Sequence, residues 1–257
     1  MNGFIQLVLA LARRRLILLK RYPLDTAGQL LTVALLFLAL FVGGRSIVGP
    51  TLGGSLGAVV IGYFLWTMAM GSYSSLAQTI TAETQWGTLE QLYVSPRRFE
   101  SIAAAIAFVF LLETFVWGSA ILGFMLLVTG VSLHVDLFTI VTIGMLSLCT
   151  AIGIGFLMGG LAILYKRIAG VLGLLQFAFI GFIAAPVAQY SVLHSVPLST
   201  GTHLLRISME DGLRLWELPP ELIALLLLKA VVYVALGMVA LRLIVNVARR
   251  RGVIGQY

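Results

Sequence analysis

Six long apolar stretches constrain this chain more than any other feature. Each holds about 20 or more mostly apolar residues, the length that an α-helix needs to cross the ~30 Å hydrocarbon core of a membrane. Backbone groups in lipid must bond within their own segment, so we expect these stretches to be helices. The predicted spans are Leu24–Gly43, Ser55–Thr79, Ser101–Val128, Leu137–Leu164, Ile168–Tyr190 and Glu221–Val245.

Composition supports an integral membrane protein. Of the 257 residues, 60% are hydrophobic and 11% are charged, whereas a soluble domain carries roughly 25% charged residues. The single cysteine, Cys149, lies in an apolar run and is expected to pack as a small hydrophobe. The predicted fold class is therefore an all-α integral membrane protein with six transmembrane helices.

The first 23 residues form a separate region. Their arginine cluster follows a short apolar run, which is the reverse of the order in a signal peptide. We interpret Gly3 to Arg21 as an amphipathic helix on the membrane surface, and the alternative is the cytosolic start of the next helix. The basic residues expected near lipid headgroups are Arg13, Arg14, Arg15, Lys20 and Arg21.

Basic residues are distributed unequally between the two sets of loops. The N-terminal region, the loop after the second span, the Lys166-Arg167 turn and the C-terminal tail together hold twelve, and the opposite loops hold three: Arg45, Arg206 and Arg214. Loops rich in Lys and Arg stay on the cytoplasmic side. We therefore expect both termini in the cytoplasm and a multi-pass location in the cell (inner) membrane. The net charge of +7 reflects this topology and contact with anionic lipids, and no basic run has the aromatic interleaving that would indicate nucleic-acid binding.

A polar segment, "AETQWGTLEQLYVSP", lies between the second and third spans. Thr81 or Thr84 can cap a helix here, and Ser95-Pro96 would end it. The predicted helix carries Trp86, Leu89 and Leu92 near one face. Either this face packs on the chain's own bundle, or the helix faces a partner through Gly87, Thr88, Glu90 and Gln91.

The same segment carries a resemblance to a known family. The pattern E-x-x-x-G-T-L-E-Q-L-x-V-S-P, from Glu83 to Pro96, resembles the signature loop of type-2 ATP-binding-cassette (ABC) exporter permeases. A weaker match, from Pro197 to Arg206, resembles the last external loop of that family, although Val196 stands where the family usually has Asn. The resemblance covers nearly the whole chain.

The resemblance implies a function and a domain plan. It implies an exporter permease whose 80–100 loop forms a coupling helix on a separate ATPase subunit, with ATP and Mg on that partner and two permease chains forming a homodimer. It also implies short re-entrant helices in the external segment 191–220, within a membrane domain of residues 24–250 followed by a cytoplasmic tail, 251–257. The residues it assigns to ATPase coupling are Glu83, Trp86, Gly87, Thr88, Leu89, Glu90, Gln91 and Leu92.

The chain has no nucleotide-binding motif of its own. A phosphate-binding loop ends in Gly-Lys followed by Ser or Thr, but the three lysines Lys20, Lys166 and Lys229 precede Arg, Arg and Ala. We therefore expect no cofactor and no enzymatic activity in this chain. His134, His194 and His203 are not spaced with further ligands as in a zinc site, so no metal site is predicted.

Three intramembrane polar residues are candidates for function, because ionisable groups are costly in lipid. Glu113 and Lys229 fall at similar depths in the third and sixth spans, which makes an ion pair between them geometrically possible, and we take this pair as a hypothesis. The alternatives are that each faces a wet cavity or a backbone carbonyl, or that Lys229 extends to the membrane surface. Gln176 is a third candidate, in the fifth span.

Small residues recur every fourth position in the fourth span. Ser147, Ala151, Gly155 and Gly159 form a row that allows close helix packing in lipid, and a substrate-contact groove is the alternative. Besides the exporter permease, the sequence leaves open an ion-coupled carrier or channel, a membrane-embedded enzyme, and a non-transporting subunit for assembly or signalling.

Overall fold

The computed structural model describes residues 2–48, 56–86, 98–165, 167–187 and 190–250, and the structural statements below concern these residues. They form α-helices, one 3-10 helix and connecting turns, and no β-strand occurs among them. The elements, in chain order, are α1 (Asn2–Arg21), α2 (Pro23–Val48), α3 (Leu56–Gln85), α5 (Phe99–Thr129), α6 (Leu137–Tyr165), α7 (Ala169–Ile183), η2 (Ser191–Ser195), α8 (Ser199–Asp211) and α9 (Pro220–Arg250).

The all-helical, membrane-like character predicted from the sequence is confirmed. Within the described residues, five helices are long and apolar enough to cross a membrane. The three longest, α3, α5 and α9, have 30 or 31 residues, which at ~1.5 Å per residue makes each about 45 Å long. Each is therefore longer than the ~30 Å hydrocarbon core that a spanning helix must cross. The five apolar stretches are Pro23–Gly43, Leu56–Glu83, Phe99–Thr129, Leu137–Tyr165 and Pro220–Arg250.

The fifth predicted span is present as a helix only in part. We expected Ile168–Tyr190, but α7 has 15 residues and ends at Ile183. It is therefore only ~22 Å long, which is less than the hydrocarbon core requires. The reason is Pro186, which has no backbone N–H for the helical ladder and restrains the residue before it.

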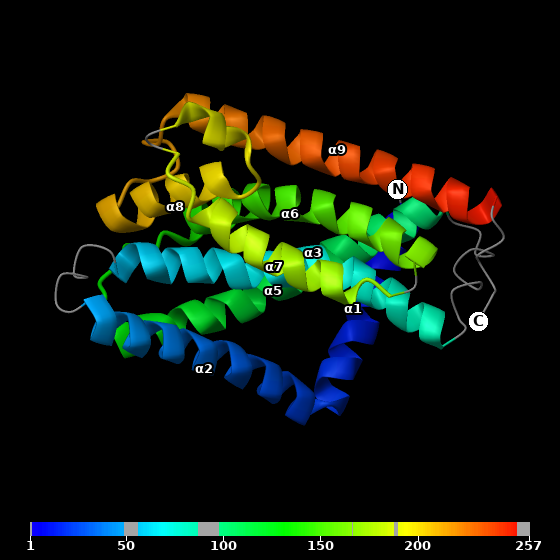
Figure 1. The fold of residues 1–257 in the computed structure, drawn as a ribbon, viewed down its shortest axis with the longest axis horizontal. Coiled ribbons are helices and arrows are strands. Elements are labelled where there is room, and N and C mark those ends of the chain that lie inside the picture. The colour runs from blue at the N-terminus through cyan, green and yellow to red at the C-terminus, as the bar shows by residue number, and fades with distance from the viewer. Residues whose placement is uncertain (1, 49–55, 87–97, 166, 188–189, 251–257) are drawn as a thin grey trace.

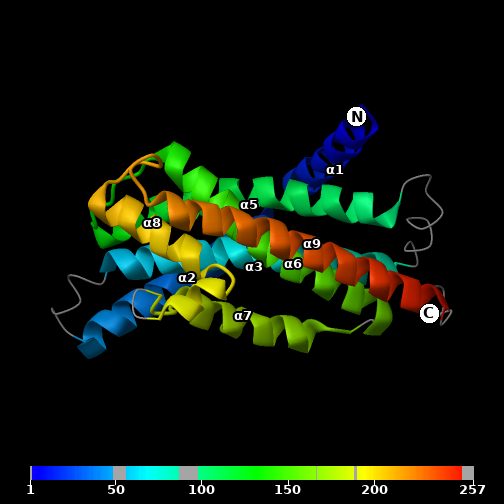
Figure 2. The ribbon, with the colours of Figure 1, turned by 90° about the horizontal axis from the view of Figure 1, so that it is seen from above.

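Helix α1 is a separate element rather than the start of the next span. It ends at Arg21 and α2 begins at Pro23, so that one residue, Tyr22, separates the two helices. It packs against α5 and projects from the bundle at a steep angle (Figure 2). Leu7 and Leu11 contact the core, while Leu9, Leu16 and Ile17 on the other faces are exposed. The exposed apolar residues beside exposed arginines are typical of a helix that lies at a membrane surface.

Helix α6 is the centre of the bundle, packed between α3 and α9 (Figure 1). The contact with α9 is very close at two glycines. A Cβ on Gly237 would lie 2.1 Å from the carbonyl oxygen of Gly153, and a Cβ on Gly153 would lie 2.3 Å from that of Tyr233. Only glycine fits at these positions, because the facing atoms belong to the backbone.

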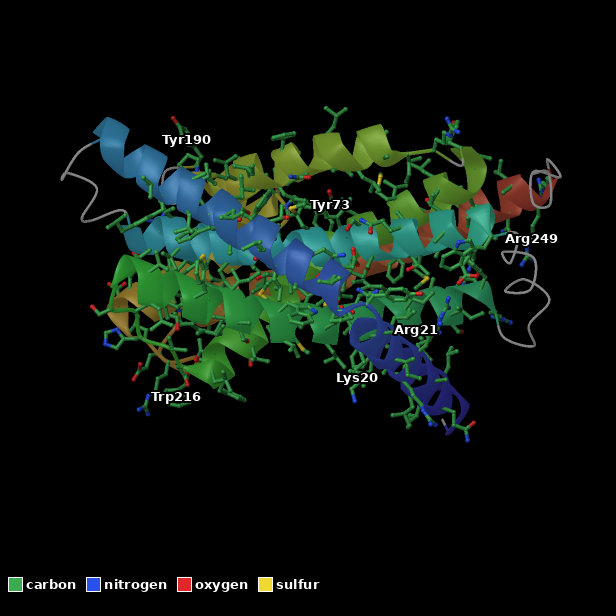
Figure 3. All side chains as sticks on the ribbon, turned by 90° about the horizontal axis from the view of Figure 1, so that it is seen from below. Lys20, Arg21, Tyr73, Tyr190, Trp216 and Arg249 are labelled. Carbon is green, nitrogen blue, oxygen red and sulfur yellow. The ribbon has the colours of Figure 1, made fainter. Side chains whose placement is uncertain are left out.

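The bundle has two distinct ends. At the first, which we call the tail end, α3, α6 and α9 finish and α5 and α7 begin (Figures 1 and 2). Exposed basic residues mark it: Arg98, Arg167, Arg249 and Arg250. The other, the α8 end, carries both charge signs. Figure 3 shows Arg249 at the tail end and Tyr190 with Trp216 at the α8 end.

The segment before α9 forms short helices, η2 and α8, connected by a tight turn. α8 packs on α6 and α3 and ends at Gly212, which has a φ of 75°. Gly201 lies inside α8, where a Cβ would overlap the Ser147 hydroxyl. Its role is close packing on α6 rather than chain reversal.

Candidate functional site

A cavity of about 530 Å³ lies among α1, α2, α3 and α5, with Gln176 of α7 at its margin. Its size falls in the range of small-molecule sites. Hydroxyl, amide and charged groups line it, although these helices are otherwise apolar, and aromatic rings of Tyr22, Trp66 and Trp117 lie beside them. The polar lining includes Asp25, Gln29, Thr67, Ser74, Gln78 and Thr114.

Glu113 is the centre of the polar network in this cavity. Its carboxylate accepts hydrogen bonds from Arg15 Nε at 2.7 Å and Nη2 at 3.0 Å, and from Trp117 Nε1 at 3.2 Å. The Arg15 Cζ also lies 4.9 Å from the centre of the Phe110 ring. The Glu113 side chain is 13% exposed and that of Arg15 is 34% exposed. A charge is thus held within the bundle by a two-point ion pair and an aromatic face.

The neighbouring arginine on α1 binds a different helix. Arg14 donates from both Nη1 and Nη2 to Glu83 Oε1, at 3.2 and 3.1 Å. Glu83 is buried near the end of α3. Two consecutive arginines therefore connect α1 to the last turn of α3 and to the middle of α5.

The predicted ion pair between Glu113 and Lys229 is wrong. Glu113 binds Arg15, and the Lys229 ammonium instead donates to the carbonyl oxygens of His194 and Val196 and, at 3.0 Å, to Thr200 Oγ1. Lys229 is 6% exposed, and one of the alternatives for it, contact with backbone carbonyls, is what the structure contains. The two residues have similar depths in their predicted spans, but their side chains do not meet in the bundle.

Of the two carbonyls that Lys229 binds, that of His194 belongs to the end of η2 and that of Val196 to the turn between η2 and α8. In this turn Leu198 has a φ of 64°, a conformation that costs energy in a residue with a Cβ. Its N–H donates to Thr150 Oγ1 of α6 at 3.2 Å, and its side chain is fully buried. Lys229 and Thr150 therefore hold a strained turn against the bundle from two sides.

The predicted coupling residues lie only in part within the described structure. Glu83 belongs to α3 and pairs with Arg14, and Trp86, at the end of α3, is 65% exposed. Gly87, Thr88, Leu89, Glu90, Gln91 and Leu92 lie outside the described residues. Their role in ATPase coupling remains a prediction.

The predicted row of small residues faces two neighbours. Gly155 lies against the backbone of Tyr73 in α3, where a Cβ would be 2.8 Å from the Tyr73 carbonyl oxygen. Gly159 lies against Leu76 of the same helix, and Ser147 meets Gly201 of α8. Ala151 is fully buried between them. None of the four lines the cavity described above.

Further polar contacts lie at the α8 end of the bundle. Asp136 caps α6, accepting from the Thr139 hydroxyl and from its N–H at 3.3 Å, and the Thr139 hydrogen bond lowers the pKa of this carboxyl. The His194 and His203 rings meet edge to face at 6.1 Å. Burial lowers the pKa of His203, and His194 and Arg206 lower it further. Among the described residues, no group of three or more His, Cys, Asp or Glu could hold a metal ion.

Sequence reasoning missed most of the cavity. Gln176 was expected as a polar residue of the fifth span, and it lines the edge of the cavity. Its backbone carbonyl oxygen accepts a hydrogen bond from Trp66 Nε1 at 3.1 Å. Arg15 was expected at lipid headgroups and not on Glu113. A signal was present, because Phe110 and Trp117 stand three and four residues from Glu113 and so share its helix face.

Comparison of the chain with family models, curated proteins and solved structures finds no match to any of them. A polar, aromatic-lined space inside an apolar bundle can hold a molecule with both polar and apolar parts.

Proposed function

We propose that this chain is the transmembrane permease subunit of an ATP-driven exporter, which moves an amphipathic, lipid-linked or drug-like substrate outward. In this proposal ATP and Mg bind a separate ABC ATPase subunit, and the chain pairs with a second copy of itself. Both termini and the tail end lie in the cytoplasm, and the protein is a multi-pass component of the cell (inner) membrane.

One observation carries the proposal. The segment that resembles the exporter signature connects α3 to α5 along the chain, and these two helices supply much of the cavity lining, including Trp66, Thr67, Ser74, Glu113 and Trp117. A partner that pushes on this segment would move both walls together. ATP hydrolysis on another chain would then change the shape of the cavity.

Helix α1 gives a second mechanical connection. The Arg14–Glu83 pair ties α1 to the turn of α3 that leads into the signature segment, and the Arg15–Glu113 pair ties α1 to the cavity. A shift of the end of α3 would reach α1 through the first pair and the cavity through the second. This contact chain supports a coupling role for Glu83 through α1.

The proposed membrane layout needs six crossings. α7 with the residues after Ile183 would make the fifth, and η2 and α8 would form the re-entrant external helices. The exposed basic residues at the tail end support a cytoplasmic location for it. Exposed apolar side chains on α2 and α7, such as Leu31, Leu35, Leu174 and Phe177, would face lipid or the second copy.

An ion-coupled carrier is a second candidate, favoured by the ion pair of Glu113 inside the bundle. Such a carrier would work without an ATPase and would follow an ion gradient. Transport by the purified chain alone, driven by a proton or sodium gradient, would distinguish it from the exporter.

Purification of the tagged full chain from native membranes tests the exporter proposal. We expect an ATPase with a phosphate-binding loop to co-purify and to hydrolyse ATP faster when bound. Glu90→Lys should release it, whereas Glu221→Lys, the same change at an exposed position of the α8 end, should not. Absence of an ATPase in the wild-type preparation, or retention in the Glu90→Lys preparation, would reject the proposal.

A further inference from the structure

The Glu113 carboxylate, the Phe110 ring and the Trp117 indole all line the cavity, and we call the space beside them the Glu113 pocket. Arg15 fills it, with its guanidinium forked onto the carboxylate and its Cζ 4.9 Å from the Phe110 ring centre. A carboxylate beside an aromatic face is the arrangement that binds guanidinium and ammonium groups in general. Arg15 thus acts as an internal ligand of a cation site.

The electrostatics around this pocket favour a cation. Among the described residues, the charged side chains that line the cavity are Arg15, Asp25 and Glu113. The lining therefore has one more negative than positive group, and it would have two uncompensated carboxylates if Arg15 moved away. Asp25 accepts a hydrogen bond from the neutral amide of Gln29, at 2.9 Å from Nε2 to Oδ2, and no ion pair of Asp25 occurs in the described part of the chain.

Arg15 is also the part of the pocket that can leave. Its side chain is 34% exposed, against 13% for Glu113, and it projects from α1, which contacts the bundle mainly along α5. Glu113, Phe110 and Trp117 instead belong to one helix, in which residues three and four apart share a face. The pocket walls would keep their relative positions when Arg15 moves.

We propose that the Glu113 pocket binds the cationic group of an amphipathic substrate, which exchanges with the guanidinium of Arg15. The apolar part of such a substrate would lie along Trp66, Leu30 and Leu36 in the rest of the cavity. The substrate class is thus organic cations with an apolar tail. The role of this pocket in transport rests on the proposed function, whereas binding of the cation itself needs no ATPase.

The experiment compares two ligands that match in shape and differ in charge. Octylguanidinium and octylurea are titrated calorimetrically into the full chain in phosphatidylcholine nanodiscs, with empty nanodiscs subtracted. We expect the wild type to prefer the guanidinium, and Arg15→Ala to tighten guanidinium binding at least tenfold while urea binding changes less than twofold. Arg13→Ala, an equal change at an exposed position of α1, should leave both affinities unchanged.

Removal of the carboxylate supplies the decisive arm. Glu113→Gln should abolish the preference for guanidinium, and so should the double variant with Arg15→Gln and Glu113→Gln, which keeps hydrogen-bonding groups and leaves no buried charge unpaired. The proposal is overturned if the preference survives Glu113→Gln, if Arg15→Ala tightens both ligands equally, or if neither ligand binds. If Arg15→Ala does not fold, the wild type against Glu113→Gln still decides. The binding experiment contains no ATPase. Its failure would therefore not decide whether an ATPase associates with the chain, which co-purification measures separately.

Discussion

The guanidinium of Arg15 meets the carboxylate of Glu113 at two points, with Nε 2.7 Å from Oε2 and Nη2 3.0 Å from Oε1. The two residues are 98 positions apart in the chain. This contact joins the N-terminal helix to the middle of a long apolar helix and lies in the lining of the cavity among α1, α2, α3 and α5. The same contact therefore bears on the stability of the fold and on the proposed function.

The ion pair should contribute measurably to stability. We expect Arg15→Gln and Glu113→Gln each to lower the free energy of unfolding by about 1.5–3 kcal/mol, the range for hydrogen bonds to charged groups. The double variant should lose less free energy of unfolding than the two single variants added together, because each single change leaves the other charge unpaired. Unfolding in mixed detergent micelles measures this cycle, and strictly additive losses would show that the pair contributes nothing.

Lys229 should stabilise the turn between η2 and α8. Lys229→Met removes its hydrogen bonds to two carbonyls and to Thr200, and we expect a loss of about 1.5–3 kcal/mol in the free energy of unfolding. Arg242→Met is the matched control, since Arg242 is exposed and pairs with Glu100, and it should cost ~1 kcal/mol or less. Equal losses in the two variants would contradict the structural role of Lys229.

The contact between α6 and α9 should tolerate no side chain at Gly237. Gly237→Ala would place a Cβ 2.1 Å from a backbone oxygen, so the helices must separate, at a cost of about 1–3 kcal/mol. Gly181→Ala makes the same change in α7, where nothing lies within 4 Å of the added carbon. We expect the control to be neutral or stabilising, because Ala is the better helix former.

Acid should destabilise the α8 end through His203. Burial and two neighbours lower its pKa in the folded chain, so the folded state takes up a proton less readily than the unfolded state. The stability that His203 contributes to the fold is fully present above the ordinary histidine pKa of ~6.5. It is lost as pH falls through the lowered pKa of the folded state. Thermal unfolding between pH 8 and pH 5 should therefore show a smaller loss of stability in His203→Gln than in the wild type. Parallel pH curves for the two proteins would contradict this.

The sequence predicted the long helices well, because each consists of apolar residues over a length that only a helix in lipid explains. Its failures have physical causes. The span prediction for Ile168–Tyr190 ignored the helix break that Pro186 imposes. The Glu113–Lys229 pair was inferred from depth alone, and depth does not specify which way a side chain points around the bundle. Which helices become neighbours depends on contacts such as Gly153 with Gly237, whose partners are far apart in the chain.

The candidate site was less predictable than the fold. Polar residues on α2, such as Asp25 and Gln29, gave no periodic signal of a shared cavity with α5, because their meeting depends on how α1 and α2 turn at Tyr22. The arginine cluster lies in a helix, α1. Its sequence did not indicate that Arg14 and Arg15 form ion pairs with Glu83 of α3 and Glu113 of α5.

The central claim is that ATP on a partner chain reshapes the cavity through the segment between α3 and α5. A single cysteine at Thr67, in a Cys149→Ser background, reports on the α3 wall of the cavity. The measurement is its alkylation rate by a water-soluble maleimide in the purified complex with the ATPase, with and without ATP and Mg. We expect ATP to change the rate at least threefold, and Gly87→Trp to abolish that change. An alkylation rate that does not change with ATP, or an equal effect of ATP in the Gly87→Trp complex, would contradict the account.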